Sequence, residues 1–148
     1  MTRRPAIVVA GLAMVVLALA LAGVRRGGHW SRTAPMRGDA ARGATLYARL
    51  PCGSCHDVEH PWPGGDICPN LGNIATEAAR IVRRPDYHGR AKDAAGYLRE
   101  SILDPNAYIV PGPSYRQADG QSVMPKTFGD TLSAAELDDL VAFLLTRR

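Results

Sequence analysis

The chain has 148 residues, of which 46% are hydrophobic, and its formal net charge is +4. A chain of this length is expected to form one small domain. Six of the 18 basic residues precede Asp39 and no acidic residue does, so 12 basic and 14 acidic residues give residues 39–148 a net charge of −2. The basic excess therefore belongs to the N-terminal part, and we expect no nucleic-acid partner.

An almost wholly apolar segment occupies residues 6–24. As a helix it would extend about 28 Å, at about 1.5 Å per residue, which is close to the hydrocarbon thickness of a bilayer. Arginine pairs flank it on both sides, at positions 3–4 and 25–26, so the positive-inside bias does not set its orientation. We predict a membrane anchor or signal segment in residues 1–26 that enters the membrane through residues 6–24.

The alternative is a signal peptide that is removed after export. Ala20-Leu21-Ala22 forms an A-x-A cleavage pattern directly before Gly23. The apolar segment is longer than a typical signal core, which favours an uncleaved anchor, and both interpretations export the residues that follow.

A flexible linker is predicted for residues 27–38, because Gly, Ser, Pro and Arg dominate there. A domain over residues 39–148 follows it. Asp39 is a suitable N-cap for a first helix, in which Ala40, Gly43, Ala44 and Tyr47 have helical spacing. A glycine weakens a helix, so Gly43 would make sense where a second helix crosses closely.

The rest of the domain reads as short helices joined by long loops. Residues 57–70 are rich in Pro and Gly and predict a loop, and residues 75–84 predict a helix that Pro85 stops. Asp93 should cap the next helix, which ends near Asp104, and residues 105–129 predict an irregular loop that carries Met124.

The last helix has the clearest signals. Ser133 and Glu136 form a capping box, and an apolar stripe follows at Leu137, Leu140, Val141 and Leu144. No alternating strand pattern of useful length occurs anywhere. The predicted fold class is all-α, with three or four short helices and long loops.

The decisive motif is Cys52-Gly53-Ser54-Cys55-His56, which matches the C-x-x-C-H pattern of haem attachment. Two thiols one helical turn apart can both bond to one side of a haem, and the histidine that follows meets the iron. Such attachment needs an exported chain, so the motif agrees with the N-terminal segment. We expect the N-terminus inside and the haem domain on the extracytoplasmic side of the cell membrane, with a single membrane pass.

The sixth iron ligand must come from elsewhere in the chain, and we predict Met124. It lies in the long loop, it precedes Pro125, which favours extended backbone, and enough chain separates it from His56 to reach the opposite face of the haem. His60 and His88 are the alternatives, and either would abolish the near-infrared charge-transfer band of iron–thioether ligation.

Two further groups of residues stand outside the motif. Cys68 is the third cysteine, and we expect a buried free thiol near the haem in preference to an intermolecular disulfide. The carboxylates of Glu59, Glu77, Glu100, Asp138 and Asp139 are expected on solvated faces.

Residues 39–148 resemble a class I c-type cytochrome with one haem. The resemblance is carried by residues 42–47 before the motif, by Pro69-Asn70-Leu71, by Met124-Pro125 and by residues 132–145. It implies that the Pro69 carbonyl accepts a hydrogen bond from His56 Nδ1. It also implies that the last helix crosses the first one at Gly43.

A narrower similarity lies in residues 97–102 and 105–112, which resemble haem domains of respiratory complexes, such as the haem-bearing end of some oxidase subunits II or the small mono-haem subunit of alternative complex III. The resemblance implies one covalent haem c, held by Cys52, Cys55, His56, Pro69 and Met124, with His56 and Met124 on the iron. It implies one-electron transfer to redox partner proteins, as a tethered carrier or as a subunit of a respiratory or photosynthetic complex, and no catalysis by the chain alone.

Two other functions fit the residues less well. One is a catalytic haem subunit, peroxidase-like or sulfur-oxidising, whose sixth ligand is labile or absent. The other is a zinc module that uses Cys52, Cys55, Cys68 and His60 as a Cys₃His set. Met124 argues against the catalytic haem subunit, because it can supply the sixth ligand. A zinc module leaves the export signal unexplained.

Overall fold

The computed structural model describes residues 38–148. The predicted anchor and all of the predicted linker except Gly38 lie outside the described residues. Within residues 38–148, no helix is both long and apolar enough to cross a membrane.

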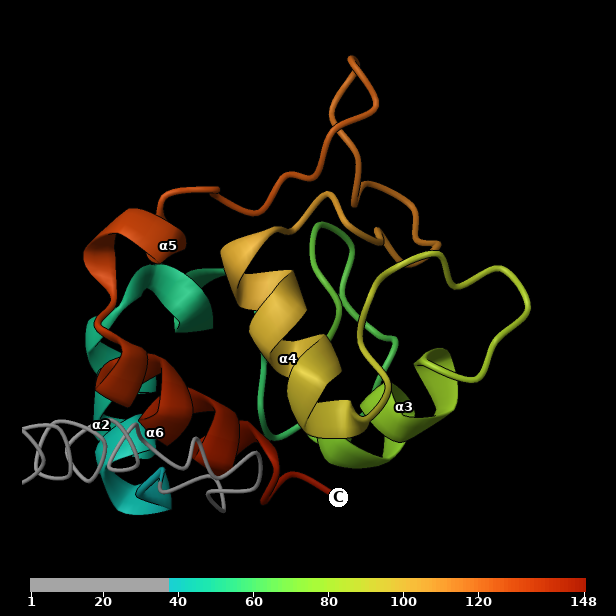
Figure 1. Cartoon of the computed structure of the whole chain (residues 1–148). Coiled ribbons are helices and arrows are strands. Elements are labelled where there is room, and N and C mark those ends of the chain that lie inside the picture. The colour runs from blue at the N-terminus through green and yellow to red at the C-terminus, as the bar shows by residue number, and fades with distance from the viewer. Residues whose placement is uncertain (1–37) are drawn as a thin grey trace, which may run out of the picture. The chain divides into compact units, whose positions relative to one another are not determined.

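The described chain is built from helices and long irregular loops (Figure 1). The elements are α2 (Ala40–Arg49), the 3₁₀ helix η1 (Pro51–Ser54), α3 (Ile74–Ile81), α4 (Ala94–Leu103), α5 (Phe128–Thr131) and α6 (Ala134–Leu144). Residues 38–148 contain no strand, and an isolated bridge pairs Arg116 with Ser122. The predicted all-α class is confirmed for this part of the chain.

Three of the helices have the predicted N-cap residues, whose side chains accept hydrogen bonds from the first turn. Asp39 accepts hydrogen bonds from the backbone N–H groups of Ala41 and Arg42, and Asp93 accepts one from Gly96 N–H. Ser133 and Glu136 form the predicted capping box at α6. These bonds satisfy backbone donors that have no partner inside the helix.

The end of α3 and the presence of α5 differ from the prediction. Helix α3 ends at Ile81, not at residue 84, because Arg83 and Arg84 already donate their backbone N–H groups in tight turns. The backbone before Pro85 is disfavoured in the α conformation, which accounts for the early end. Helix α5 lies partly inside the predicted loop of residues 105–129; it is four residues long and has no side-chain cap, so no sequence signal marks it.

Helices α2 and α6 pack against each other at Gly43, as the family resemblance implied (Figure 1). A Cβ atom at Gly43 would collide with the backbone carbonyl of Asp139 and with Cβ of Phe143. The two backbones can approach this closely only without a side chain at this position. Next to this point, the rings of Tyr47 and Phe143 pack with their centroids 5.5 Å apart.

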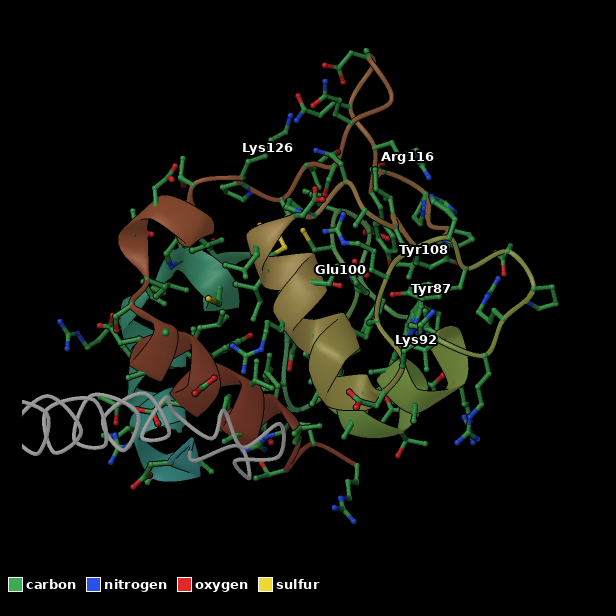
Figure 2. The ribbon with its side chains drawn as sticks, in the orientation of Figure 1. Tyr87, Lys92, Glu100, Tyr108, Arg116 and Lys126 are labelled. Carbon is green, nitrogen blue, oxygen red and sulfur yellow. The ribbon has the colours of Figure 1, made fainter. Side chains whose placement is uncertain are left out.

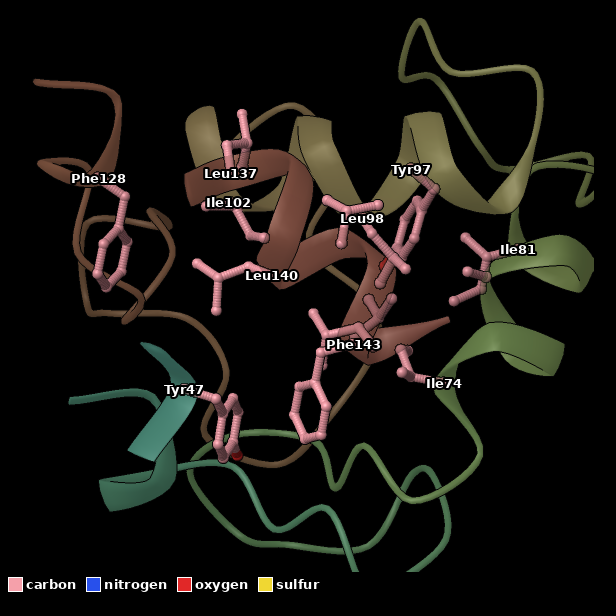
Figure 3. Packing of buried hydrophobic residues seen from close by; sticks show 14 of the residues in the cluster. Tyr47, Ile74, Ile81, Tyr97, Leu98, Ile102, Phe128, Leu137, Leu140 and Phe143 are labelled. Atoms are coloured by element: carbon pink, nitrogen blue, oxygen red, sulfur yellow. The ribbon is translucent and has the colours of Figure 1, made fainter. Parts of the chain in front are cut away.

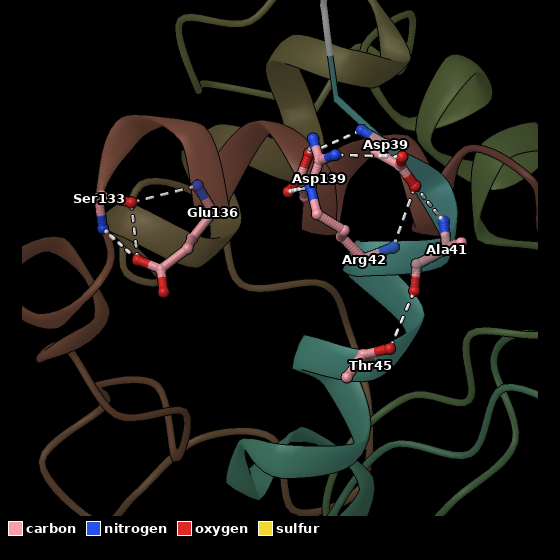
Figure 4. A network of polar contacts seen from close by, with 7 residues as sticks. All are labelled: Asp39, Ala41, Arg42, Thr45, Ser133, Glu136 and Asp139. Atoms are coloured by element: carbon pink, nitrogen blue, oxygen red, sulfur yellow. Dashed lines mark hydrogen bonds and ion pairs between the residues drawn. The ribbon is translucent and has the colours of Figure 1, made fainter.

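A buried carboxylate joins the same two helices, and here the prediction of a solvated face was wrong. Asp139 is 5% exposed, and it accepts hydrogen bonds from Asp39 N–H at 2.6 Å and from Arg42 Nε at 2.7 Å (Figure 4). The hydrogen bond from Arg42, and after it the one from Asp39, hold the pKa of Asp139 below its usual value. A buried carboxylate needs such partners to stay ionised.

Glu100 is a second carboxylate that does not lie on a solvated face. Its side chain is only 9% exposed, and it accepts hydrogen bonds from Tyr87 Oη at 2.6 Å and from Arg90 N–H at 2.9 Å. Figure 2 shows Tyr87 and Glu100 beside Tyr108, whose ring packs against Tyr87 with 5.1 Å between centroids. Glu100 thus fixes the loop between α3 and α4 onto α4.

The core is formed by one face of each longer helix. The predicted stripe of α6 is buried, and Figure 3 shows its Leu137 and Leu140 among residues of α2, α3 and α4. These buried side chains are Tyr47 of α2, Ile74, Ala78 and Ile81 of α3, Tyr97, Leu98 and Ile102 of α4, and Leu137, Leu140, Val141, Phe143 and Leu144 of α6. Several of them also form the wall of the cavity described below.

Substitution Gly43→Ala is expected to destabilise the folded domain by about 1–3 kcal/mol, because the new methyl group overpacks the α2–α6 contact. Denaturant unfolding of the haem-loaded protein measures the change. Gly129→Ala is the control, since its Cβ would lie 3.8 Å from the nearest atom, in ordinary contact. Equal stability of the two variants would contradict the close crossing.

Candidate cofactor site

A large cavity lies within the domain and reaches the surface. The empty space inside it is about 980 Å³, counting the part open to solvent. The wall is mainly apolar and comes from helices and loops far apart in the sequence. It includes Tyr47, Leu50, Cys52, His56, Cys68, Pro69, Leu71, Tyr97, Leu98, Ile102, Tyr108, Val110, Tyr115, Ser122, Met124, Phe128, Leu140 and Leu144.

The C-x-x-C-H motif forms one tight turn at the edge of this cavity. Cys52 lies in η1, Cys55 follows as its C-cap, and the His56 backbone N–H donates to the Cys52 carbonyl at 2.9 Å. Cys52 is half-buried in the cavity wall and Cys55 is exposed. Tyr47 Oη donates to the His56 carbonyl at 2.5 Å, so α2 holds the motif in place.

The His56 ring is fixed in orientation and in tautomer. Its Nδ1 lies 2.7 Å from the Pro69 carbonyl oxygen, which can only accept, so Nδ1 carries the proton and Nε2 keeps a free lone pair. Desolvation lowers the pKa of His56, against the opposing effect of the Pro69 hydrogen bond, and this favours the neutral ring. A neutral, oriented imidazole with a free nitrogen is a ready metal ligand.

The Pro69 carbonyl lies in a loop that is irregular but firmly held. Asn70 N–H donates to the Pro63 carbonyl at 3.0 Å, and Leu71 N–H donates to the Asp57 carbonyl at 2.5 Å. The buried Tyr115, from the loop after α4, brings its hydroxyl within 3.1 Å of the Gly65 carbonyl oxygen. Tyr115 thereby links the loop that carries Pro69 to the loop that carries Met124.

Met124 lines the same cavity as His56. It is half-buried, and its backbone N–H donates to Ser122 Oγ at 3.1 Å. The two alternative ligands lie outside the cavity wall: His60 is exposed and pairs with Asp57 at 2.8 Å, and His88 is exposed with its Nδ1 3.1 Å from the Asp86 carbonyl. The fold therefore gives Met124 access to the cavity and leaves both histidines on the surface.

The zinc hypothesis receives no support from the geometry. Among the residues that the structure describes, no group of three or more His, Cys, Asp or Glu side chains is arranged to hold a metal ion. His60 in particular is exposed and paired with Asp57.

The chain matches the cytochrome c family over residues 40–148. It belongs to this family. Comparisons with curated proteins and with solved structures each returned no match. Cytochrome c domains bind haem c covalently, usually one in a domain of this size, and carry electrons between redox partners.

The residues of this cytochrome domain fit haem c. The cavity is apolar, as a flat hydrophobic macrocycle requires, and thiols stand at its edge beside a neutral imidazole with a free nitrogen. A thioether from a distant loop lies in the same wall.

Sequence reasoning missed several polar residues of the cavity wall. Tyr108, Tyr115 and Ser122 are buried there; the two tyrosines form hydrogen bonds to other loops, and Ser122 forms them within its own loop. Tyr108 lies in residues 105–112, which resemble haem domains of respiratory complexes, but that resemblance did not indicate a role for it. No neighbouring sequence pattern marks Tyr115 or Ser122 as a residue of the cavity wall. The positions of the two tyrosines depend on how distant loops meet.

Cys68 is buried in the cavity wall at 4% exposure, which confirms the predicted burial. Burial, and after it the neighbouring Cys55, raise the pKa of Cys68. A buried thiol that stays protonated is a poor nucleophile.

Iodoacetamide should therefore leave Cys68 unmodified in the folded, haem-loaded protein and modify it after denaturation, as mass spectrometry of its peptide will show. Cys68→Ser provides the control for assignment of the label. Rapid modification in the folded state would contradict the burial.

Proposed function

We propose that the domain transfers single electrons through a haem c bonded to Cys52 and Cys55, with His56 and Met124 as the two axial ligands. The observation that carries the proposal is that a neutral His56 ring, fixed by the Pro69 carbonyl, lines the same cavity as Met124. One imidazole and one thioether are the ligand set that raises the potential of a haem.

The residues of the chain have separate roles in this function. Haem c, when bound, supplies an iron centre that alternates between the ferric and ferrous states. The hydrogen bond to Pro69 keeps the His56 ring in one orientation, and the apolar wall excludes water from the cofactor. Two ligands supplied by the protein need little rearrangement between the two oxidation states, which favours transfer over catalysis.

The location is part of the proposal. Residues 6–24 are long and apolar enough to anchor the chain, and covalent haem attachment requires export. The domain would then stand on the extracytoplasmic side of the cell membrane, joined by residues 27–38. It would act there as a tethered carrier or as a fixed subunit of a respiratory or photosynthetic complex, which the similarity of residues 97–102 and 105–112 to haem domains of respiratory complexes supports.

A catalytic haem site with a labile sixth ligand is the alternative. The presence of Met124 in the cavity wall opposes it, because a catalytic site needs an open coordination position. Rapid binding of carbon monoxide to the reduced wild-type protein would favour this alternative.

Substitution Met124→Ala is expected to abolish the near-infrared iron–thioether band and to lower the midpoint potential, because the thioether is lost from the iron. Absorption spectroscopy and redox titration of the haem-loaded protein measure both effects. His60→Ala and His88→Ala are matched controls that should retain the band. An unchanged band in Met124→Ala, or its loss in a histidine variant, would assign the sixth ligand elsewhere.

The anchor predicts that native protein stays in the membrane fraction after alkaline carbonate extraction and begins at Met1 or Thr2. A variant that replaces residues 1–26 with a cleavable signal should be released as a soluble, haem-bearing protein. Native material that begins at Gly23 would show that the segment is removed.

A further inference from the structure

Apart from the tyrosines, Ser122 is one of two polar or charged residues that are buried among residues 38–148, with 6% exposure. The other is Asp139, whose burial is explained by the contact between α2 and α6. Ser122 lies in the wall of the cofactor cavity, two residues before Met124. Burial of a polar side chain is costly unless its hydrogen bonds are formed, so the partners of Ser122 indicate its role.

Each polar group of Ser122 has a partner. Its Oγ accepts from Met124 N–H at 3.1 Å, its backbone N–H donates to Asn106 Oδ1 at 2.8 Å, and its carbonyl accepts from Gln117 Nε2 at 2.8 Å. The next residue, Val123, donates its N–H to the Tyr115 carbonyl at 3.3 Å. Ser122 is therefore the point where three segments of the loop meet.

The bond to Met124 matters because of the residue that follows. Pro125 has no N–H, so Met124 N–H is the only backbone donor of these two residues that can attach this part of the loop to the domain. Ser122 Oγ accepts the hydrogen bond from this N–H group. Without the hydroxyl, Met124 would be joined to the domain only through its side chain and its chain neighbours.

Asn106 connects this arrangement to a rigid element. It follows α4 by three residues, and α4 places Tyr97, Leu98 and Ile102 in the cavity wall. The Asn106–Ser122 hydrogen bond thus sets the position of the Met124 loop relative to the helix beside the cofactor.

We propose that Ser122, held by Asn106, is a positioning residue that keeps the Met124 thioether in place for axial ligation. This inference rests on the proposed His56/Met124 ligation. Ser122 does not touch the iron itself; it acts through the backbone of Met124.

The test is a titration of the ferric, haem-loaded full chain with imidazole. The loss of the near-infrared thioether band measures how much Met124 has been displaced. Ser122→Ala removes one hydrogen bond and leaves the backbone bonds of residue 122 intact. Since such a bond contributes on the order of 1 kcal/mol, imidazole should displace Met124 with an equilibrium constant about fivefold higher. Ser122→Thr keeps the hydroxyl and should restore the wild-type value, and Asn106→Ala should act in the same direction as Ser122→Ala.

Ser133→Ala is the matched control, because it removes a serine hydroxyl that caps α6 and that does not line the cavity. It should lower global stability and leave the imidazole titration unchanged. A wild-type titration in Ser122→Ala, in a protein that retains the thioether band, would overturn the positioning role alone. Absence of the band from the wild-type protein would overturn the His56/Met124 ligation and, with it, this inference.

Discussion

The apolar cavity is the constraint on which the rest of the domain depends. A small helical domain normally fills its centre with side chains, but here the same residues, such as Tyr97 and Leu140, belong both to the core and to the cavity wall. The protein must therefore keep its helices apart on one side while packing them tightly elsewhere. The contact of α2 with α6 at Gly43 supplies that tight packing, and it lies beside the turn that carries the cysteine motif.

Loops form the remainder of the cavity wall. Side-chain hydrogen bonds hold these loops in place, whereas backbone hydrogen bonds hold the helices. Tyr115 joins the loop of Pro69 to the loop of Met124, and Asn106 and Ser122 join the latter to α4. Each of these residues is buried or half-buried and forms hydrogen bonds with distant segments. Proline-rich loops can offer few backbone donors, so such side-chain bonds determine where the two faces of the cavity lie.

Signals that act over a few residues made much of the fold predictable. Asp39, Asp93 and Ser133 begin helices through bonds to residues two or three positions away, and sequence spacing reveals such bonds directly. Asp139 was misjudged because its partners, Asp39 and Arg42, lie about a hundred positions earlier. The cofactor motif could be read from spacing, and Met124 from its loop and the proline after it. Tyr115 acts where separate loops meet, and Ser122 acts inside an irregular loop with no regular period, so no regular spacing indicated either residue.

The hydrogen bond from Asp39 N–H to Asp139 has a mechanical consequence. The chain enters the domain at a residue that is bonded to the last helix as well as to the first. A pull on Asp39 would therefore load both helices together instead of peeling α2 away one turn at a time.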